Sequence, residues 1–123
     1  MAFEDTLAVK LMRKHKDGVT VACRLKNDFV NSQGVLHGGV IASIADEAAW
    51  HALIHAYKSQ QNCTTTELKI NYLRPIAVTK VLARAYALRA GKHLFVSRVD
   101  IFDAEKRLAA VGVVTYMLLN SAK

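Results

Sequence analysis

Residues 38–57 constrain the fold more than any other part of this chain of 123 residues. They are apolar on most sides, and a helix that is apolar nearly all round is usually buried. Six alanines lie along the stretch, at positions 42, 45, 48, 49, 52 and 56, and such small side chains let strands approach the helix closely. The sequence therefore predicts one long, buried helix in the middle of the fold.

The segments that follow this helix have the composition of β-strands. Residues 64–73, 78–90, 92–103 and 107–119 are separated by Pro75, Gly91 and a polar run at 103–106. Turn signals about every dozen residues between β-branched runs favour an antiparallel meander. The alanine and leucine content of residues 82–90 would also suit a helix, so this segment has two possible interpretations.

The residues before the long helix predict a second helix and a further strand. Four apolar residues lie at helical spacing: Phe3, Leu7, Leu11 and Met12. They predict a short amphipathic helix over residues 4–15, which ends before Gly18. Residues 19–25 alternate as in a strand, and residues 26–36 form a loop whose flexible point is Gly34. The expected fold class is α+β, with an antiparallel, curved sheet wrapped around one long central helix.

Composition places the chain among compact globular proteins. With 52% hydrophobic residues, one proline and six glycines, residues 1–123 suit a single domain with one core. No run of about 18 uncharged apolar residues is present, so no membrane span is expected, and the first residues lack the layout of a secretory signal. Cys23 and Cys63 lie in strand-like apolar runs, which favours buried, reduced thiols in a cytoplasmic protein.

The net charge of +7 indicates an anionic partner. The lysines and arginines are scattered along the chain, however, and only residues 13–16 form a short basic run. Nucleic-acid binding would require a basic stripe with exposed aromatic residues, so nucleic acid is not an expected partner. A small ligand that carries phosphate groups fits the charge as well.

Residues 31–46 contain the chemical groups that best indicate a function. An asparagine, a glycine, a histidine and a glycine pair stand directly before the apolar helix, and Asp46 lies within its Ala/Ile/Val run. A carboxylate among such neighbours is costly to bury unless something satisfies it or uses it. Backbone N–H groups at a glycine-rich helix start can hold a developing oxyanion. Because no serine or cysteine nucleophile is evident, these groups favour hydrolysis of an activated carbonyl.

Six residues of this segment match a known family at fixed spacing: Asn31, Gly34, His37, Gly38, Gly39 and Asp46. The pattern resembles the hotdog-fold acyl-CoA thioesterases, and within them most closely the PaaI-type branch of phenylacetyl-CoA thioesterases. Residues 65–75, Thr-Thr-Glu-Leu-Lys-Ile-Asn-Tyr-Leu-Arg-Pro, are similar to the family's strand after the helix. The resemblance covers residues 19–119 and departs from the family at residues 78 and 79, where Val-Thr replaces the usual Gly-Asp.

The resemblance implies which groups react. The backbone N–H of Gly38 or Gly39 would polarise a thioester carbonyl, and Asp46 would act as a general base on water or as a nucleophile through a mixed anhydride. On one helix, however, Gly38 and Asp46 are separated by about 12 Å, because each residue rises by about 1.5 Å. If both act on one substrate, the acid must come from a second copy, related by a two-fold axis. We therefore expect a homodimer with shared active sites, and the family's dimers and frequent tetramers agree.

Other matching residues would assist the reaction. The resemblance implies that Asn31 and His37 orient the carbonyl or the water. It also places Thr65 where family members often have a hydroxyl that helps the attacking water, with Thr64 as the alternative if the loop length differs. Ordinary strand composition explains the threonine run equally well.

The resemblance further implies a CoA thioester as the substrate, with the CoA phosphates on a basic surface. Arg74 is the candidate phosphate contact, Gly34 and Gly39 would help to bind the substrate, and Trp50 would line the acyl pocket or belong to the core. Three other arginines could also contact the phosphates, although each also suits a solvated strand position: Arg84, Arg89 and Arg98. The sequence does not fix the acyl group, which could be aromatic, short or medium in length.

Simpler interpretations stay open beside these roles. Asp46 could be an acid held for structure, and residues 37–39 could form an ordinary turn into a helix. Glu47, His51 and His55 share one helical face, but polar surface explains them better than a metal site does. We therefore predict an acyl-CoA thioester hydrolase without a metal or redox cofactor. The alternatives are a non-catalytic acyl-CoA-binding protein and a hotdog dehydratase that acts on acyl thioesters.

Overall fold

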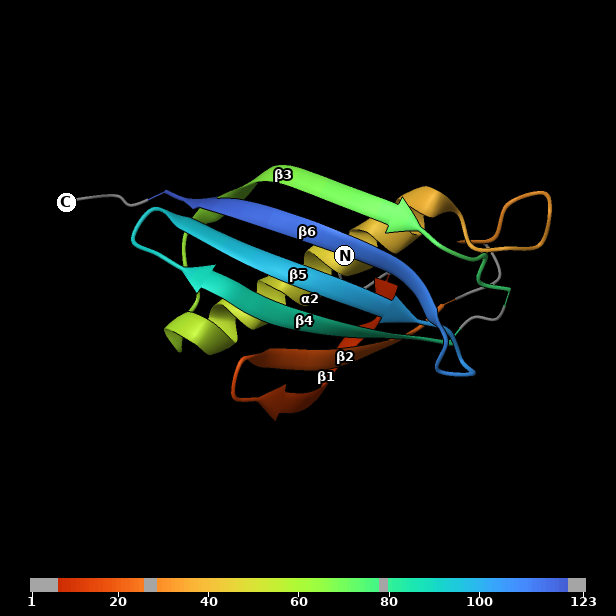
Figure 1. The fold of residues 1–123 in the computed structure, drawn as a ribbon, viewed down its shortest axis with the longest axis horizontal. Helices are drawn as coiled ribbons and strands as arrows, with labels where there is room; N and C mark the ends of the chain where they lie inside the picture. Colours follow the sequence, from red (N-terminus) through yellow and green to blue (C-terminus); the bar gives the residue numbers. More distant parts are fainter. Residues whose placement is uncertain (1–6, 26–28, 78–79, 120–123) are drawn as a thin grey trace.

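The strands of the protein form one antiparallel sheet that curves around a single long helix. The computed structural model describes residues 7–25, 29–77 and 80–119. In chain order the elements are β1 (Val9–His15), β2 (Gly18–Arg24), α2 (Gly38–Tyr57), β3 (Cys63–Tyr72), β4 (Lys80–Ala90), β5 (Leu94–Phe102) and β6 (Leu108–Leu118). In the sheet they lie in the order β1-β2-β4-β5-β6-β3 (Figure 1). The predicted fold class is confirmed.

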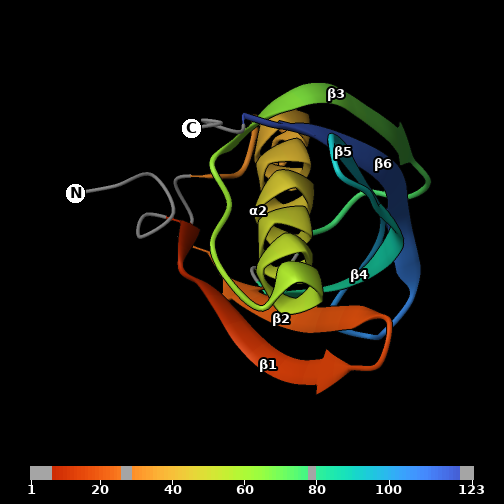
Figure 2. The ribbon, with the colours of Figure 1, turned by 90° about the vertical axis from the view of Figure 1, so that its left-hand side faces the viewer.

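Helix α2 fills the concave side of the sheet (Figure 2). Its buried residues are Ile41, Ile44, Ala45, Ala48, Ala49, Ala52 and Leu53. Four of these are alanines, which agrees with the close approach expected of small side chains. Burial of each large apolar side chain contributes about 1.5–3 kcal/mol. Within the described residues, no helix has both the length and the apolar character needed to span a bilayer.

The expectation that α2 is buried on nearly all sides is only partly correct. Trp50 and Ile54 are half-buried, as are Asp46 and His51. The edge strands β1 and β3 lie on opposite sides of the helix, and no strand of the described chain covers the side that remains (Figure 2). One side of α2 therefore packs on the sheet while the other stays partly accessible.

The predicted N-terminal helix is wrong for residues 9–15, which form strand β1 and pair with β2. The register shifts between Leu11 and Arg13, so that Met12 is a bulge residue and is exposed. A bulge interrupts the two-residue alternation of a strand, which explains why the adjacent apolar residues Leu11 and Met12 fit a helical pattern better than a strand pattern. Residues 1–6 lie outside the described part of the chain.

Gly18 does not end a helix but begins β2, directly after the turn of the β1–β2 hairpin. A Cβ atom at this position would overlap the carbonyl oxygen of Ala85 on the neighbouring strand β4. Glycine is thus required here because two backbones approach each other closely.

The strands after the helix are confirmed, but their order is not a simple meander. β4, β5 and β6 follow one another as neighbours, including the segment 82–90 that also suited a helix, whereas β3 crosses the sheet to pair with β6 at the far edge. The backbone N–H groups of Leu73 and Arg74 both donate to the Ala109 carbonyl, which fixes the end of β3. Residues 78 and 79, where the sequence departs from the family pattern, lie outside the described residues.

Both cysteines are free thiols. Cys23 is buried, as expected, and burial raises its pKa to about 11, so it stays a protonated and unreactive thiol at neutral pH. Cys63, at the start of β3, is only half-buried, so the expectation of burial is wrong for this residue.

Candidate active site

Within the described part of the chain, the start of α2 has one backbone N–H group without a hydrogen-bond acceptor. His37 is the N-cap, with φ −62° and ψ 136°, and its Nδ1 accepts a hydrogen bond from the Gly39 N–H at 3.1 Å. The N–H groups of Val40 and Ile41 both donate to the His37 carbonyl. Helix starts leave four N–H groups without helical partners. Here these are the N–H groups of residues 37–40. Among the described residues, the Gly38 N–H is the one of the four that donates to no acceptor.

The loop before α2 is shaped by Asn31. Its Oδ1 accepts hydrogen bonds from the N–H groups of Gln33 at 2.9 Å and Val35 at 3.3 Å. Gly34, with φ +79°, makes the turn between them, a conformation that glycine adopts without strain. The loop then returns His37 to the Phe29 carbonyl through a backbone hydrogen bond. In this structure Asn31 and Gly34 therefore hold the loop that presents the helix start.

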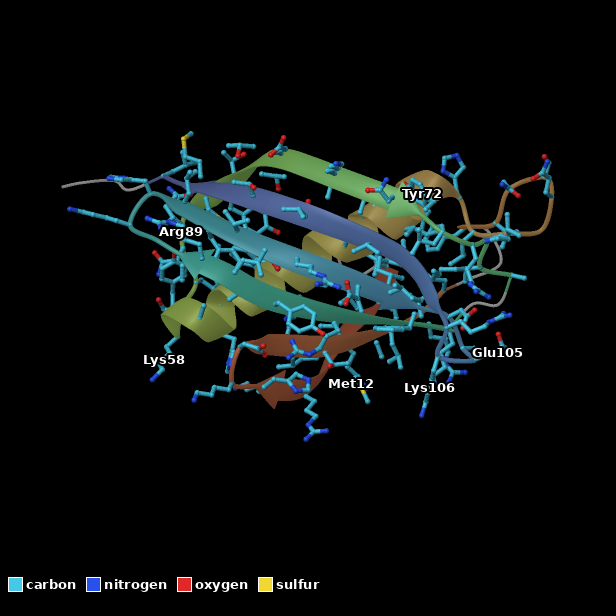
Figure 3. The ribbon with its side chains drawn as sticks, in the orientation of Figure 1. Met12, Lys58, Tyr72, Arg89, Glu105 and Lys106 are labelled. Carbon is cyan, nitrogen blue, oxygen red and sulfur yellow. The ribbon has the colours of Figure 1, made fainter. Side chains whose placement is uncertain are left out.

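Tyr72, at the end of β3, lies against the helix start. Its hydroxyl donates to the Gly38 carbonyl at 2.7 Å, and Figure 3 places it beside the first turn of α2. A pocket of about 280 Å³ opens at this point, lined by Leu36, Gly38, Ile41, Tyr72, Leu73, Arg74 and Pro75. Tyr72 is not among the site residues predicted from the sequence, although it lies two residues after Ile70, on the face of β3 that points to the helix.

Asp46 lies in the middle of α2, half-buried, and two hydroxyl groups bind one of its carboxylate oxygens. Oδ1 accepts from the Thr65 hydroxyl at 3.0 Å and from the Tyr116 hydroxyl at 2.9 Å. The Tyr116 hydroxyl also lies 2.6 Å from the Asp46 backbone carbonyl oxygen. The sequence analysis missed Tyr116, which comes from β6.

The neighbouring threonines are distinguished by their register. Thr65 is paired with Tyr116, and Thr64 is paired with Met117. Because successive side chains of a strand point to opposite faces, Thr64 faces away from Asp46. The structure therefore brings Thr65, rather than Thr64, to the carboxylate.

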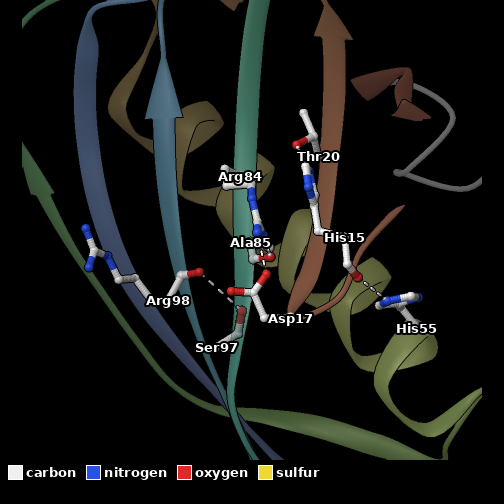
Figure 4. Close-up of polar contacts among 8 residues, drawn as sticks. All are labelled: His15, Asp17, Thr20, His55, Arg84, Ala85, Ser97 and Arg98. Atoms are coloured by element: carbon white, nitrogen blue, oxygen red, sulfur yellow. Dashed lines mark hydrogen bonds and ion pairs between the residues drawn. The ribbon is translucent and has the colours of Figure 1, made fainter. Parts of the chain in front are cut away.

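The helical face with Glu47, His51 and His55 forms no metal centre in this structure. His55 Nε2 donates to the His15 carbonyl at 2.6 Å, which attaches the helix to the β1–β2 hairpin (Figure 4). Burial lowers the pKa of His51, so this imidazole is neutral at neutral pH. No group of three or more metal-ligating side chains occurs within residues 7–25, 29–77 and 80–119.

Comparison with known proteins identifies the family of this chain. Residues 33–110 match the family described as the thioesterase superfamily. The chain belongs to this superfamily. It is 32% identical to the medium/long-chain acyl-CoA thioesterase YigI of Escherichia coli over 133 residues, which cover 96% of this chain and 86% of YigI.

Solved structures of other proteins have the same fold. A thioesterase from Haemophilus influenzae superposes with a TM-score of 0.87 at 24% identity, covering 98% of this chain and 84% of that one. The PaaI protein of the Escherichia coli phenylacetic acid degradation operon gives 0.83 at 19% identity, covering 95% and 83%. At these identities the likeness concerns the fold. Together with the family match, it confirms the predicted hotdog fold, and the likeness to PaaI is a likeness of fold. The family match and the relationship to YigI confirm the predicted enzyme class, which hydrolyses thioesters.

The arginines considered for the CoA phosphates of a thioesterase substrate lie in different places. Arg74 lines the pocket at the helix start. Arg84 forms an ion pair with Asp17 (Figure 4) and also lies over the Tyr86 ring. Arg98 pairs with Asp100. These two are therefore committed to contacts within the sheet.

Arg89 and Trp50 are the other residues considered for substrate binding in this member of the superfamily. Arg89 lies at the end of the molecule opposite to Tyr72 (Figure 3), and thus far from the helix start. Trp50 is half-buried and packs against the hydrophobic core, one helical turn beyond Asp46. Arg74 is therefore the arginine of this set that lies at the helix start.

Proposed function

We propose that this protein is an acyl-CoA thioester hydrolase in which Asp46 promotes the attack of water. The observation that carries the proposal is the environment of the carboxylate. Asp46 is half-buried, and both side-chain hydroxyl groups that bind it donate to Oδ1. A carboxylate held in this way is oriented and accessible, as a general base requires.

In the proposed reaction, the thioester carbonyl accepts a hydrogen bond from the Gly38 N–H at the positive end of the helix dipole. Asp46 takes a proton from water as the water oxygen bonds to the carbonyl carbon. The tetrahedral intermediate then collapses and the carbon–sulfur bond breaks. The sulfur takes up the proton that Asp46 removed from water and leaves as the thiol of CoA. Alternatively, the carboxylate itself attacks, and water hydrolyses the resulting mixed anhydride. His37 and Asn31 would orient the carbonyl or the water.

The proposal includes a homodimer in which each site uses Gly38 of one chain and Asp46 of the other. The separation of about 12 Å along α2 prevents one helix from supplying both groups to one carbonyl. Strand β3 offers a surface for a second chain, because it is an edge strand of 10 residues with Leu68 and Tyr72 at 39% and 52% exposure. Unpaired edges of this kind readily accept another strand. A tetramer built from two such dimers is compatible with this arrangement.

The relationship to YigI supports medium- and long-chain acyl-CoAs as the first candidate substrates. Arg74, in the pocket beside Gly38, is the proposed contact for a CoA phosphate. The net charge of +7 would attract an anionic substrate of this kind. Trp50, on the partly accessible side of α2, is the proposed residue of the acyl pocket.

The function is tested by measuring thiol release from aryl, short-chain, medium-chain and long-chain acyl-CoAs, together with the Kd of each. We expect saturable turnover of at least one class, with medium- or long-chain substrates preferred. Binding without turnover would identify a non-catalytic acyl-CoA-binding protein. Turnover of a 3-hydroxyacyl or enoyl thioester without thiol release would identify a dehydratase. Either result would overturn the proposal.

Replacement of Thr65 with alanine is expected to lower kcat about tenfold, since a hydrogen bond to a charged group contributes about 1.5–3 kcal/mol. Thr64→Ala is the matched control, because the same hydroxyl is removed from the adjacent residue on the opposite face. Steady-state rates of both variants check the expectation. Equal rates for Thr65→Ala and Thr64→Ala would exclude a role for Thr65.

A further inference from the structure

Among the described residues, Asp46 is the one residue to which the Tyr116 hydroxyl makes hydrogen bonds. We infer that Tyr116 is a positioning residue, which fixes the Asp46 carboxylate so that Oδ2 is the oxygen that acts on water or on the thioester. The inference rests on the proposed hydrolase function and assigns a role to a residue that the sequence motif does not contain.

The ring of Tyr116 is held rigidly. The residue is 4% exposed, at a position of β6 whose side chain points to the helix. Its ring stacks on Phe95 of β5, with ring centroids 6.3 Å apart and an angle of 14° between the planes. Because aromatic rings in a packed core have little freedom, the hydroxyl has a fixed position relative to α2.

Tyr116 acts as the hydrogen-bond donor in this contact. Burial raises the pKa of Tyr116 far above its usual value, and the Asp46 carboxylate raises it further. The phenol therefore stays protonated at neutral pH. Cys63, the thiol beside the pair, also has a raised pKa because of burial and then of Asp46, so it stays neutral.

The single proton of the phenol is shared by two acceptors of one residue. A tyrosine hydroxyl has one O–H, and here it lies 2.6 Å from the Asp46 carbonyl oxygen and 2.9 Å from Oδ1. The contact therefore ties the Asp46 side chain to its own backbone and restricts rotation about its side-chain bonds.

Tyr116 and Thr65 together distinguish the two carboxylate oxygens. They are paired directly opposite each other on β6 and β3, and both donate to Oδ1. Two donors occupy Oδ1 and leave Oδ2 as the oxygen with no hydrogen-bond partner among the described residues. A base that is oriented before the substrate binds needs no reorganisation during the reaction.

The test is Tyr116→Phe, which keeps the ring and removes the hydroxyl. We expect kcat to fall about tenfold while KM stays within about twofold, since the loss concerns orientation of the base and not substrate binding. Tyr57→Phe is the matched control, because the Tyr57 hydroxyl also donates to a backbone carbonyl, that of Gly91 at 2.6 Å, and its ring also contacts Phe95. The control should lose similar stability and keep its kcat.

A double-mutant cycle with Asp46→Asn separates positioning from a structural effect. If Tyr116 acts through Asp46, Tyr116→Phe should change the residual kcat of the Asp46→Asn protein by less than about twofold, because coupled residues are not additive. An additional tenfold loss, or equal kcat values for Tyr116→Phe and wild type, would overturn the inference. Full activity of Asp46→Asn itself would instead overturn the proposed mechanism, so the two failures are distinguishable.

Discussion

Replacement of Asp46 with asparagine is expected to lower kcat/KM for acyl-CoA hydrolysis by about a hundredfold or more, the loss typical of removing a general base or nucleophile. A hundredfold loss corresponds to about 2.7 kcal/mol of transition-state stabilisation. Asparagine has nearly the same size, and its side-chain oxygen can still accept hydrogen bonds from Thr65 and Tyr116. The substitution therefore removes the charge and the basic oxygen while the contacts that hold the side chain are kept.

Two measurements show whether the loss lies in the chemical step and not in folding or substrate binding. The thermal midpoint of the variant should stay close to that of wild type, because the packing around α2 does not change. Its Kd for a non-hydrolysable acyl-CoA analogue should change by less than about threefold, since the loss is confined to the transition state. Wild-type turnover by a folded Asp46→Asn protein would contradict a catalytic role for this carboxylate.

The sequence predicted the parts of the fold that depend on local pattern. The central helix ends where its apolar and alanine-rich run ends, and the strands from β3 to β6 follow the alternation between turn residues. Strand β1 was mistaken for a helix because the bulge at Met12 breaks the two-residue period. The position of β3 beside β6 could not be predicted from local pattern, because turn residues show where a strand ends and not which strand it pairs with.

The candidate site could also be predicted from the sequence only where its residues are close together along the chain. Asn31, His37 and Gly38 lie within one short segment, where local hydrogen bonds bring them together, and the distance from Gly38 to Asp46 follows from the rise of the helix that carries both. Tyr72 and Tyr116 reach the site from strands that are 34 and 70 residues away from their partners. In the sequence, each is an ordinary aromatic residue of a strand. Their hydroxyl groups acquire a role only when the sheet curves around α2.

Replacement of Gly38 with proline is expected to lower kcat about 10²- to 10³-fold, the cost of removing one oxyanion-hole donor. Proline deletes the backbone N–H and is favoured at the first position of a helix, where that group has no helical acceptor. The preceding residue must be extended, and His37 already has φ −62° and ψ 136°. A Cβ at position 38 would lie 3.4 Å from the Tyr72 ring, which is ordinary contact.

Gly38→Ala is the matched control, because it adds the same Cβ and retains the N–H. Steady-state rates of the two variants should therefore differ by about tenfold or more, even allowing for the larger proline ring. Equal rates would show that the added carbon, rather than the lost donor, limits the reaction. They would also leave the Gly39 N–H, which is bonded to His37 in this structure, as the alternative donor.

Mixing these two inactive variants tests whether the sites are shared. In a purified heterodimer of Gly38→Pro and Asp46→Asn chains, one site would combine Gly38 of one chain with Asp46 of the other, both intact, while the second site would carry both changes. We expect about half of the wild-type activity per dimer, since a two-fold axis generates two sites. A homodimer with both changes in each chain should remain inactive. If each chain instead formed its own site, both chains of the heterodimer would lack one group, and no activity would return.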